Sequence, residues 1–454
     1  MTGSHTRLAA IETLSQLEKT RKPVSLLFDT IAGRYRISGS DRQLAMKIVY
    51  GVLRNRDYLD RLLKILCNRP LNRIKPFVHH ALHSGLYQIF FLDRIPPSAA
   101  INETVNALKT RKFPTQLQGF VNGVLRQSLR RRDELPSPDE PDANNRPPLN
   151  HPAWLTKRWL RRYGEEEMVR ICKHNNGEAQ LCLRAHSANA KQTVSDALAA
   201  QGLVYENGLY APDALLLRDY SGPVVDLPGI REGIVHVQDQ AAQLAAMLLA
   251  PFPADLACLD GCAGLGGKTL HLIELLEGGN AHLTAVEPDR HRYRILSESL
   301  ASPPASIDIE LANDTFQHFC SCTTRRFDRI LIDAPCSGTG VIGRHPDIRW
   351  NRREKDLAGY AGRQLELLSA AAGVTSPGGV LVYATCSIEA EENEVVIERF
   401  LDRHDEFHTS DCSTILPASC SGLIRDGFFA PLPAYGIDGF FAARLVKRGK
   451  DDER

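Results

Sequence analysis

Two cysteines and an aspartate stand where the sequence predicts that apolar strands end. Asp333 closes the apolar run 327–333, Cys336 follows three residues later, and Cys386 follows a second apolar run, 380–385. A single cysteine is more often an apolar core residue than a nucleophile. A pair of thiols beside a carboxyl group can, however, form a covalent bond to a substrate while protons are exchanged. These three side chains are the predicted chemical site.

A glycine-rich turn at 261–269, Gly-Cys-Ala-Gly-Leu-Gly-Gly-Lys-Thr, separates a predicted strand (257–260) from a predicted helix (268–276). Glycines in such a turn let the backbone approach a ligand closely. A P-loop would require glycine at Cys262, and a dinucleotide fingerprint would require glycine at Thr269. The third interpretation is an S-adenosylmethionine site, which has no pyrophosphate to hold.

Acidic residues after the next two strands extend this predicted cofactor site. Glu287 ends the strand 283–287, the first strand after the glycine-rich turn, where a carboxylate accepts hydrogen bonds from ribose hydroxyls. Asp314 follows the strand 308–311 and could hold an adenine amino group. Lys268 either adds positive potential near the site or lies on the surface; the sequence leaves both open.

The elements that position these residues alternate regularly from about residue 235. Strands are predicted at 257–260, 283–287, 308–311, 327–333 and 380–385, and helices at 268–276, 289–300, 353–374 and 391–401. This order predicts a parallel sheet with helices on both faces. A late strand, 440–446, has no crossover helix before it and is expected to run antiparallel. Ligands bind at the carboxyl ends of such parallel strands.

The segment 1–132 carries apolar side chains at helical spacing and predicts a small all-α domain. It contains 23 Lys and Arg against 8 Asp and Glu, a net charge of +15, whereas the rest of the chain has a net charge of −14. A polycationic domain favours an anionic partner, and nucleic acid is the usual one. A proline-rich linker is predicted at 133–150, a small α+β module at 151–232, and the α/β domain at 233–450.

Composition excludes several classes of protein. No apolar run is long enough to span a bilayer, and the N-terminus lacks the apolar core of a signal peptide. The eleven cysteines are scattered and show no zinc-ligand spacing. We expect a cytoplasmic protein with reduced thiols, no metal site and no membrane association.

The motifs resemble one known family. Residues 333–340, Asp-Ala-Pro-Cys-Ser-Gly-Thr-Gly, together with 384–387, Ala-Thr-Cys-Ser, resemble the RNA cytosine-5 methyltransferases of the NOL/Sun type. Residues 262–268 resemble that family's Cys-Ala-Ala-Pro-Gly-Gly-Lys, with Gly264 and Leu265 in place of Ala and Pro, a change expected to loosen the loop. Segments 237–241 and 438–441 match as well, and the N-terminal helices resemble a NusB-type RNA-binding domain.

The resemblance implies a Rossmann-like class I methyltransferase domain that transfers a methyl group to C5 of a cytosine in 16S ribosomal RNA. It implies Cys386 as the nucleophile that adds to C6 and Cys336 as the residue that assists release; chemistry places Asp333 at N3. The substrate would be the RNA alone or a small-subunit assembly particle, and the protein a monomer. Two alternatives stay open: a tRNA cytosine-5 methyltransferase, and an inert RNA-binding or assembly factor. The residues expected to bind S-adenosylmethionine are Cys262, Ala263, Gly264, Leu265, Gly266, Gly267, Lys268, Glu287, Asp314 and Asp333.

Overall fold

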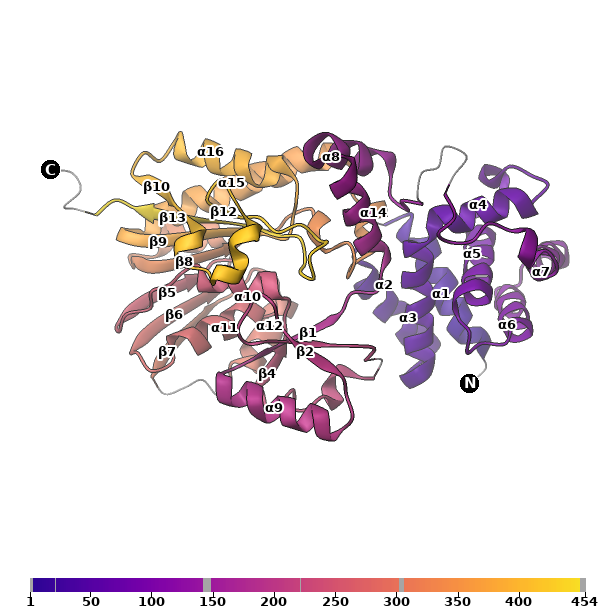
Figure 1. Ribbon diagram of the computed structural model, residues 1–454, viewed down its shortest axis with the longest axis horizontal. Coiled ribbons are helices and arrows are strands. Elements are labelled where there is room, and N and C mark those ends of the chain that lie inside the picture. The colour runs from indigo at the N-terminus through magenta and orange to yellow at the C-terminus, as the bar shows by residue number, and fades with distance from the viewer. Residues whose placement is uncertain (1–2, 21, 142–147, 221, 302–305, 450–454) are drawn as a thin grey trace. The chain divides into compact units, whose positions relative to one another are not determined.

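The computed structural model describes residues 3–20, 22–141, 148–220, 222–301 and 306–449 (Figure 1). The chain divides into two compact units: Met1–Glu178 with Ile342–Glu354, and Ala179–Val341 with Lys355–Arg454. Residues 142–147 of the predicted linker lie outside the described residues. Among the residues described, no helix is both long enough and apolar enough to cross a membrane.

The regular elements that the structure describes in the first unit are all helices, as predicted for the N-terminal part. The apolar spacing determines which helix faces are buried: Val78, Leu82, Leu86 and Ile89, one stripe of α5, are each at most 5% exposed. The helices are α1 (Gly3–Leu17), α2 (Val24–Tyr35), α3 (Gly39–Arg54), α4 (Arg56–Leu66), α5 (Pro76–Phe91), α6 (Pro97–Thr110), α7 (Thr115–Arg130) and α8 (Ala153–Asn176).

A late segment of the chain, Ile342–Glu354, belongs to this helical unit. It contains the short helix α14 (Ile348–Asn351). Arg349 is fully buried and donates hydrogen bonds to the carbonyls of Asn150 (2.9 Å) and Asn175 (2.7 Å), and Trp350 Nε1 donates to the carbonyl of Leu53 (2.8 Å). The prediction of one helix from residue 353 was therefore wrong at its start.

The second unit begins with a small antiparallel sheet in the order β2-β3-β1-β4. Its strands are β1 (Leu181–Ala185), β2 (Tyr205–Asn207), β3 (Ala214–Leu217) and β4 (Val235–Val237), and α9 (Ala188–Ala200) packs against β1 and β4. The predicted α+β character of this region is confirmed.

A larger mixed sheet follows, in the order β11-β12-β13-β9-β8-β5-β6-β7, with β10 paired to β13 (Figure 1). Strands β5 to β9 are parallel, and β13 runs antiparallel to β9, as predicted. The strands are β5 (Leu256–Asp260), β6 (Ala281–Val286), β7 (Ile307–Ala312), β8 (Phe327–Asp333), β9 (Thr375–Thr385), β10 (Phe407–Ser410), β11 (Ile424–Arg425), β12 (Phe428–Phe429) and β13 (Phe441–Lys447).

Alternate side chains of the sheet enter two different cores. Leu259, Ile330 and Leu381 pack with α13 (Phe316–Cys322), α15 (Leu357–Val374) and α16 (Glu394–Leu401). Cys258, Leu331 and Val382 pack with α10 (Gln240–Met247), α11 (Gly267–Leu276) and α12 (Arg290–Ser299) on the other face. The strand order reverses between β5 and β8, and the carboxyl ends at such a reversal are where open α/β sheets bind ligands.

Candidate active site

The two predicted cysteines meet at the carboxyl ends of β8 and β9. The parallel register pairs Asp333 with Ala384, so the residues just beyond each strand lie beside one another. The sulfurs of Cys336 and Cys386 are 3.3 Å apart, and both side chains are half-buried. The structure therefore forms the thiol pair that the sequence predicted.

The surroundings of Cys336 favour its protonated form. The hydrogen bond with Cys386 raises the pKa of Cys336 well above its usual value, and burial and the charges of Cys386, Glu392 and Asp333 raise it further. A thiol with such a pKa keeps its proton at neutral pH. Cys336 therefore keeps its own proton at neutral pH.

Lys268 lies inside the site rather than on the surface. Its Nζ is 2.6 Å from Oδ2 of Asp333 and 5.5 Å from the centre of the Phe440 ring, and its side chain is only 13% exposed. Burial lowers the pKa of Lys268, but the carboxylate of Asp333, and more weakly Cys386, raise it by more. The ammonium group is therefore a stable positive charge beside both Asp333 and Cys386.

A buried carboxylate that sequence reasoning missed joins the two cysteine loops. Glu392 is fully buried and accepts hydrogen bonds from the backbone of Ser337 (2.8 Å) and from the hydroxyls of Ser337 and Ser387 (2.7 Å for Ser387). Burial raises the pKa of Glu392. The only signal in the sequence is its place five residues after Ser387, in a stretch predicted to start a helix.

Two glycines bring a third loop to the site. Gly340 N donates to the carbonyl of Cys386 (3.0 Å), and Gly439 N donates to the carbonyl of Gly340 (2.9 Å). A Cβ at Gly340 would lie 2.0 Å from the carbonyl oxygen of Gly439. Only glycine allows this approach, which explains why segment 438–441 carries a recognisable motif.

The glycine-rich turn and Glu287 form one structure. Glu287 is 4% exposed; its Oε2 accepts from Gly264 N (2.9 Å) and its Oε1 from Asp289 N (2.8 Å). Each carboxylate oxygen retains a second lone pair, which suits a ribose hydroxyl donor. Gly266 has φ +92°, and a Cβ there would lie 2.8 Å from Leu296. The turn and the carboxylate fit the expected cofactor.

The remaining predicted cofactor residues differ in burial and in their hydrogen-bond partners. Ala263 is buried and donates to the carbonyl of Val286 (3.1 Å), Cys262 N donates to Asp260 (3.3 Å), and Leu265 is 59% exposed. Asp314 accepts hydrogen bonds from Thr315 N (2.7 Å) and from His318. The Asp314 carboxylate thus bonds its own loop, through Thr315, and α13, through His318.

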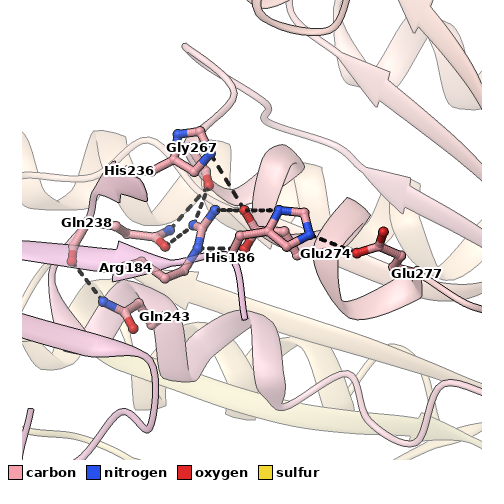
Figure 2. A network of polar contacts seen from close by, with 8 residues as sticks. All are labelled: Arg184, His186, His236, Gln238, Gln243, Gly267, Glu274 and Glu277. Atoms are coloured by element: carbon pink, nitrogen blue, oxygen red, sulfur yellow. Dashed lines mark hydrogen bonds and ion pairs between the residues drawn. The ribbon is translucent and has the colours of Figure 1, made fainter. Parts of the chain in front are cut away.

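A buried arginine from the small sheet supports the glycine-rich turn (Figure 2). Arg184, fully buried on β1, donates to both carboxylate oxygens of Glu274 (2.8 and 2.7 Å), to the carbonyl of Gly267 (3.1 Å) and to Gln238. Gln238 also donates to the Gly267 carbonyl (3.4 Å). These contacts fix the first residue of α11, which directly precedes Lys268.

Comparison with known families divides the chain into a helical, a small α+β and an α/β part, in the order that the sequence predicted. Residues 246–446 match the family described as 16S rRNA methyltransferase RsmB/F, residues 4–130 match the NusB family, and residues 151–223 match the ferredoxin-like domain of RsmF/B-like methyltransferases. Among solved structures, the chain is similar to the crystal structure of PH0851, with a TM-score of 0.77 and 23% identity over 98% of this chain and 99% of that one. A methyltransferase homolog from Pyrococcus horikoshii matches with a TM-score of 0.55 and 25% identity, over 66% of this chain and 96% of that one.

Full-length relatives are more similar in sequence. The probable ribosomal RNA small subunit methyltransferase B of Bacillus subtilis is 34% identical over 461 residues, which is 99% of this chain and 100% of the relative. Ribosomal RNA small subunit methyltransferase B of Escherichia coli O6:K15:H31 is 36% identical over 97% of this chain and 98% of the relative. Because this similarity spans the catalytic motifs and the helical unit alike, the chain belongs to the RsmB/F family of 16S rRNA methyltransferases.

Proposed function

We propose that this protein transfers a methyl group to C5 of a cytosine in 16S ribosomal RNA through a transient bond between Cys386 and C6. The observation that carries the proposal is the thiol pair: two sulfurs 3.3 Å apart, in surroundings that raise the pKa of Cys336.

Addition of a thiolate to C6 answers the main chemical difficulty. C5 of cytosine is a weak nucleophile in the intact aromatic ring, and addition at C6 makes it enamine-like. The ammonium of Lys268 stabilises a thiolate at Cys386, and it can pass a proton through Asp333 to N3 of the base. Asp333 is the residue proposed to hold N3.

Release requires a base for the C5 proton. Once Cys386 is bonded to C6, its hydrogen bond with Cys336, the largest cause of the high pKa of Cys336, is weakened. Lys268, left neutral by the proton that it gave to N3, can then take up the thiol proton of Cys336 through Asp333, and the resulting Cys336 thiolate takes the proton from C5. The electron pair of the C5–H bond restores the ring double bond and expels Cys386 as a thiolate, and N3 returns its proton to solvent.

S-adenosylmethionine is the cofactor of this family's reaction, and when bound it supplies an electrophilic methyl group. We propose that the turn 262–268 cradles it, that Glu287 accepts from the ribose, and that Asp333 borders the site from β8. For Asp314 we keep the proposed adenine contact, which would require its carboxylate to accept one more donor than Thr315 and His318 provide.

Bisulfite sequencing tests the proposal, because 5-methylcytosine resists conversion to uracil. Unmethylated 16S RNA, small-subunit particles and tRNA would each be incubated with the protein and S-adenosylmethionine. We expect a protected cytosine in 16S RNA or its particle, lost with Cys386→Ala and retained with Cys322→Ala, an exposed cysteine. Protection in tRNA alone would favour the tRNA enzyme, and no protection at all would favour the inert RNA-binding factor.

A further inference from the structure

Two histidines and an aspartate converge in the helical unit, whereas the thiols belong to the other unit. His79 and His83 are four residues apart on α5, which places both on one face of the helix. Asp60 comes from α4, and its Oδ1 is 2.8 Å from Nε2 of His79 and 2.8 Å from Nε2 of His83. Nothing in the methyl-transfer chemistry uses these residues.

The three donor atoms have the arrangement of a cation site. They all lie within 4.8 Å of one another, and the two imidazole rings are 4.2 Å apart, centre to centre. A tetrahedral zinc ion with bonds of about 2.0–2.1 Å holds its donors about 3.3 Å apart. Small rotations of the side chains would open the 2.8 Å contacts to that spacing.

Burial leaves one side of the cluster open. The side chain of His83 is fully buried, whereas those of His79 and Asp60 are 16% and 25% exposed. A cation could therefore enter from solvent and keep a water molecule as its fourth ligand. Two imidazoles and a carboxylate form a donor set that suits zinc, and i, i+4 histidines on a helix are a common way to supply it.

We propose, against the sequence-based expectation of no metal site, that Asp60, His79 and His83 bind Zn²⁺ and join α4 to α5. On binding, each imidazole presents the Nε2 lone pair and carries its proton on Nδ1, and the carboxylate exchanges two hydrogen bonds for one metal bond. A cation bound only by the folded unit raises its stability by mass action.

Co²⁺ is the probe that separates this site from the cysteines, because thiolate ligands give an intense near-ultraviolet charge-transfer band and nitrogen and oxygen ligands do not. The full-length protein, treated with chelator and dialysed, would be titrated with Co²⁺ and then with Zn²⁺ in competition. We expect one Co²⁺ per chain with visible ligand-field bands and no thiolate band, displaced by Zn²⁺, and a Zn²⁺-dependent rise in the unfolding temperature.

Partly exposed ligands are the variants of choice, because His83→Ala could disrupt the core. His79→Gln and Asp60→Asn should each weaken binding at least about tenfold, with circular dichroism confirming the helical fold. The matched control is His282→Gln, whose imidazole likewise bonds a carboxylate, that of Asp308 (2.8 Å), but in the other unit; it should bind as the wild type does. Unchanged binding in His79→Gln and Asp60→Asn, a thiolate band alone, or no binding to the wild type would each overturn the proposal.

Discussion

The proposed chemistry gives the two cysteines unequal roles. Their sulfurs are 3.3 Å apart and the pKa of Cys336 is raised, so with Cys386 as the nucleophile, removal of each sulfur should stop the reaction at a different step. Cys386→Ala can form no bond to RNA. Cys336→Ala should still add to C6 and accept the methyl group, but the C5 proton stays and elimination stalls.

We therefore expect a protein–RNA adduct from Cys336→Ala that accumulates only when S-adenosylmethionine is supplied. A denaturing gel with labelled RNA would show it as a slowly migrating band, and the Cys336→Ala/Cys386→Ala double variant should lack it. A band from Cys386→Ala but not from Cys336→Ala would reverse the assignment of roles.

A second residue-scale prediction concerns Asp260, at the end of β5. Burial raises the pKa of Asp260 to about 6, although the Thr269 hydroxyl donates to its carboxylate (2.7 Å). An unfolded aspartate titrates near 3.9, so the folded chain holds a proton that the unfolded chain has lost. The contribution of Asp260 to the free energy of unfolding is therefore greatest below about pH 4 and falls until about pH 6.

Asp260→Asn cannot ionise and should escape this loss. The free energy of unfolding of Asp260→Asn minus that of the wild type should rise by about 2–3 kcal/mol from pH 4 to pH 7, since one pKa unit corresponds to about 1.4 kcal/mol. Urea unfolding at both pH values measures the difference. A wild-type-minus-variant difference that does not change with pH would contradict it.

At the scale of elements, Arg184 connects β1 to the first turn of α11. Arg184→Met would leave Glu274 buried, with a side chain 6% exposed, and without its charged partner, at a cost of about 3–5 kcal/mol. Arg184→Met/Glu274→Met removes the unpaired charge and should recover most of that stability. Both variants lose the arginine's hydrogen bond to the Gly267 carbonyl, so both should bind S-adenosylmethionine about tenfold more weakly.

Urea unfolding and calorimetric titration separate the two effects. Arg329→Met is the matched control, because Arg329 is a buried arginine of the same unit that holds the carbonyl of Pro251 instead of the glycine-rich turn. It should lower stability and leave cofactor affinity nearly unchanged. Wild-type affinity in the double variant would show that the Arg184 contacts serve folding alone.

The sequence predicted the parallel strands and the thiol pair because their signals are local. The run 327–333 centres on the apolar residues Ile330, Leu331 and Ile332 and is the strand β8 as predicted, and cysteines just beyond two neighbouring parallel strands must lie close together. The helices of the N-terminal part follow equally from their apolar stripes.

What the sequence could not predict depends on contacts between distant segments. Residues 353–356 have helix-forming composition, yet α15 begins at Leu357: Arg353 and Glu354 belong to the helical unit, and Glu354–Asp356 form a 3-10 turn. The strands β2 and β4 are three residues long, too short for a periodic pattern. Glu392 and Arg184 read as ordinary charged residues until tertiary structure buries them against specific donors and acceptors.

At the scale of the molecule, the charge of the helical unit should govern RNA affinity. Lys64, Arg69, Arg73 and Lys75 are all exposed between the end of α4 and the start of α5. Arg73→Gln/Lys75→Gln should weaken RNA binding and reduce the slope of log affinity against log salt by about 1.4–1.8, if each side chain neutralises one phosphate. Filter binding over a range of salt concentrations measures the slope.

The control removes two charges from the other unit. Arg399→Gln/Arg403→Gln changes two exposed arginines at the end of α16 and should leave the salt slope unchanged. Substituting single residues is preferable to deleting residues 1–132, because such a deletion would also remove the carbonyl of Leu53 that Trp350 bonds. Equal slopes for the two double variants would argue against the helical unit as the main RNA contact.

Segment Ile342–Glu354 also sets the order in which the protein can be completed during synthesis. Helices α1 to α8 leave the ribosome first, yet their unit includes a segment that is translated only after Ala179–Val341 of the other unit. At about 5–20 residues per second, that separation is roughly 10–30 seconds of translation. During this interval the carbonyls of Leu53, Asn150 and Asn175 lack the hydrogen bonds that Trp350 and Arg349 later donate. A nascent chain halted before residue 342 therefore presents an incomplete helical unit, which a chaperone or a protease can distinguish from the finished one.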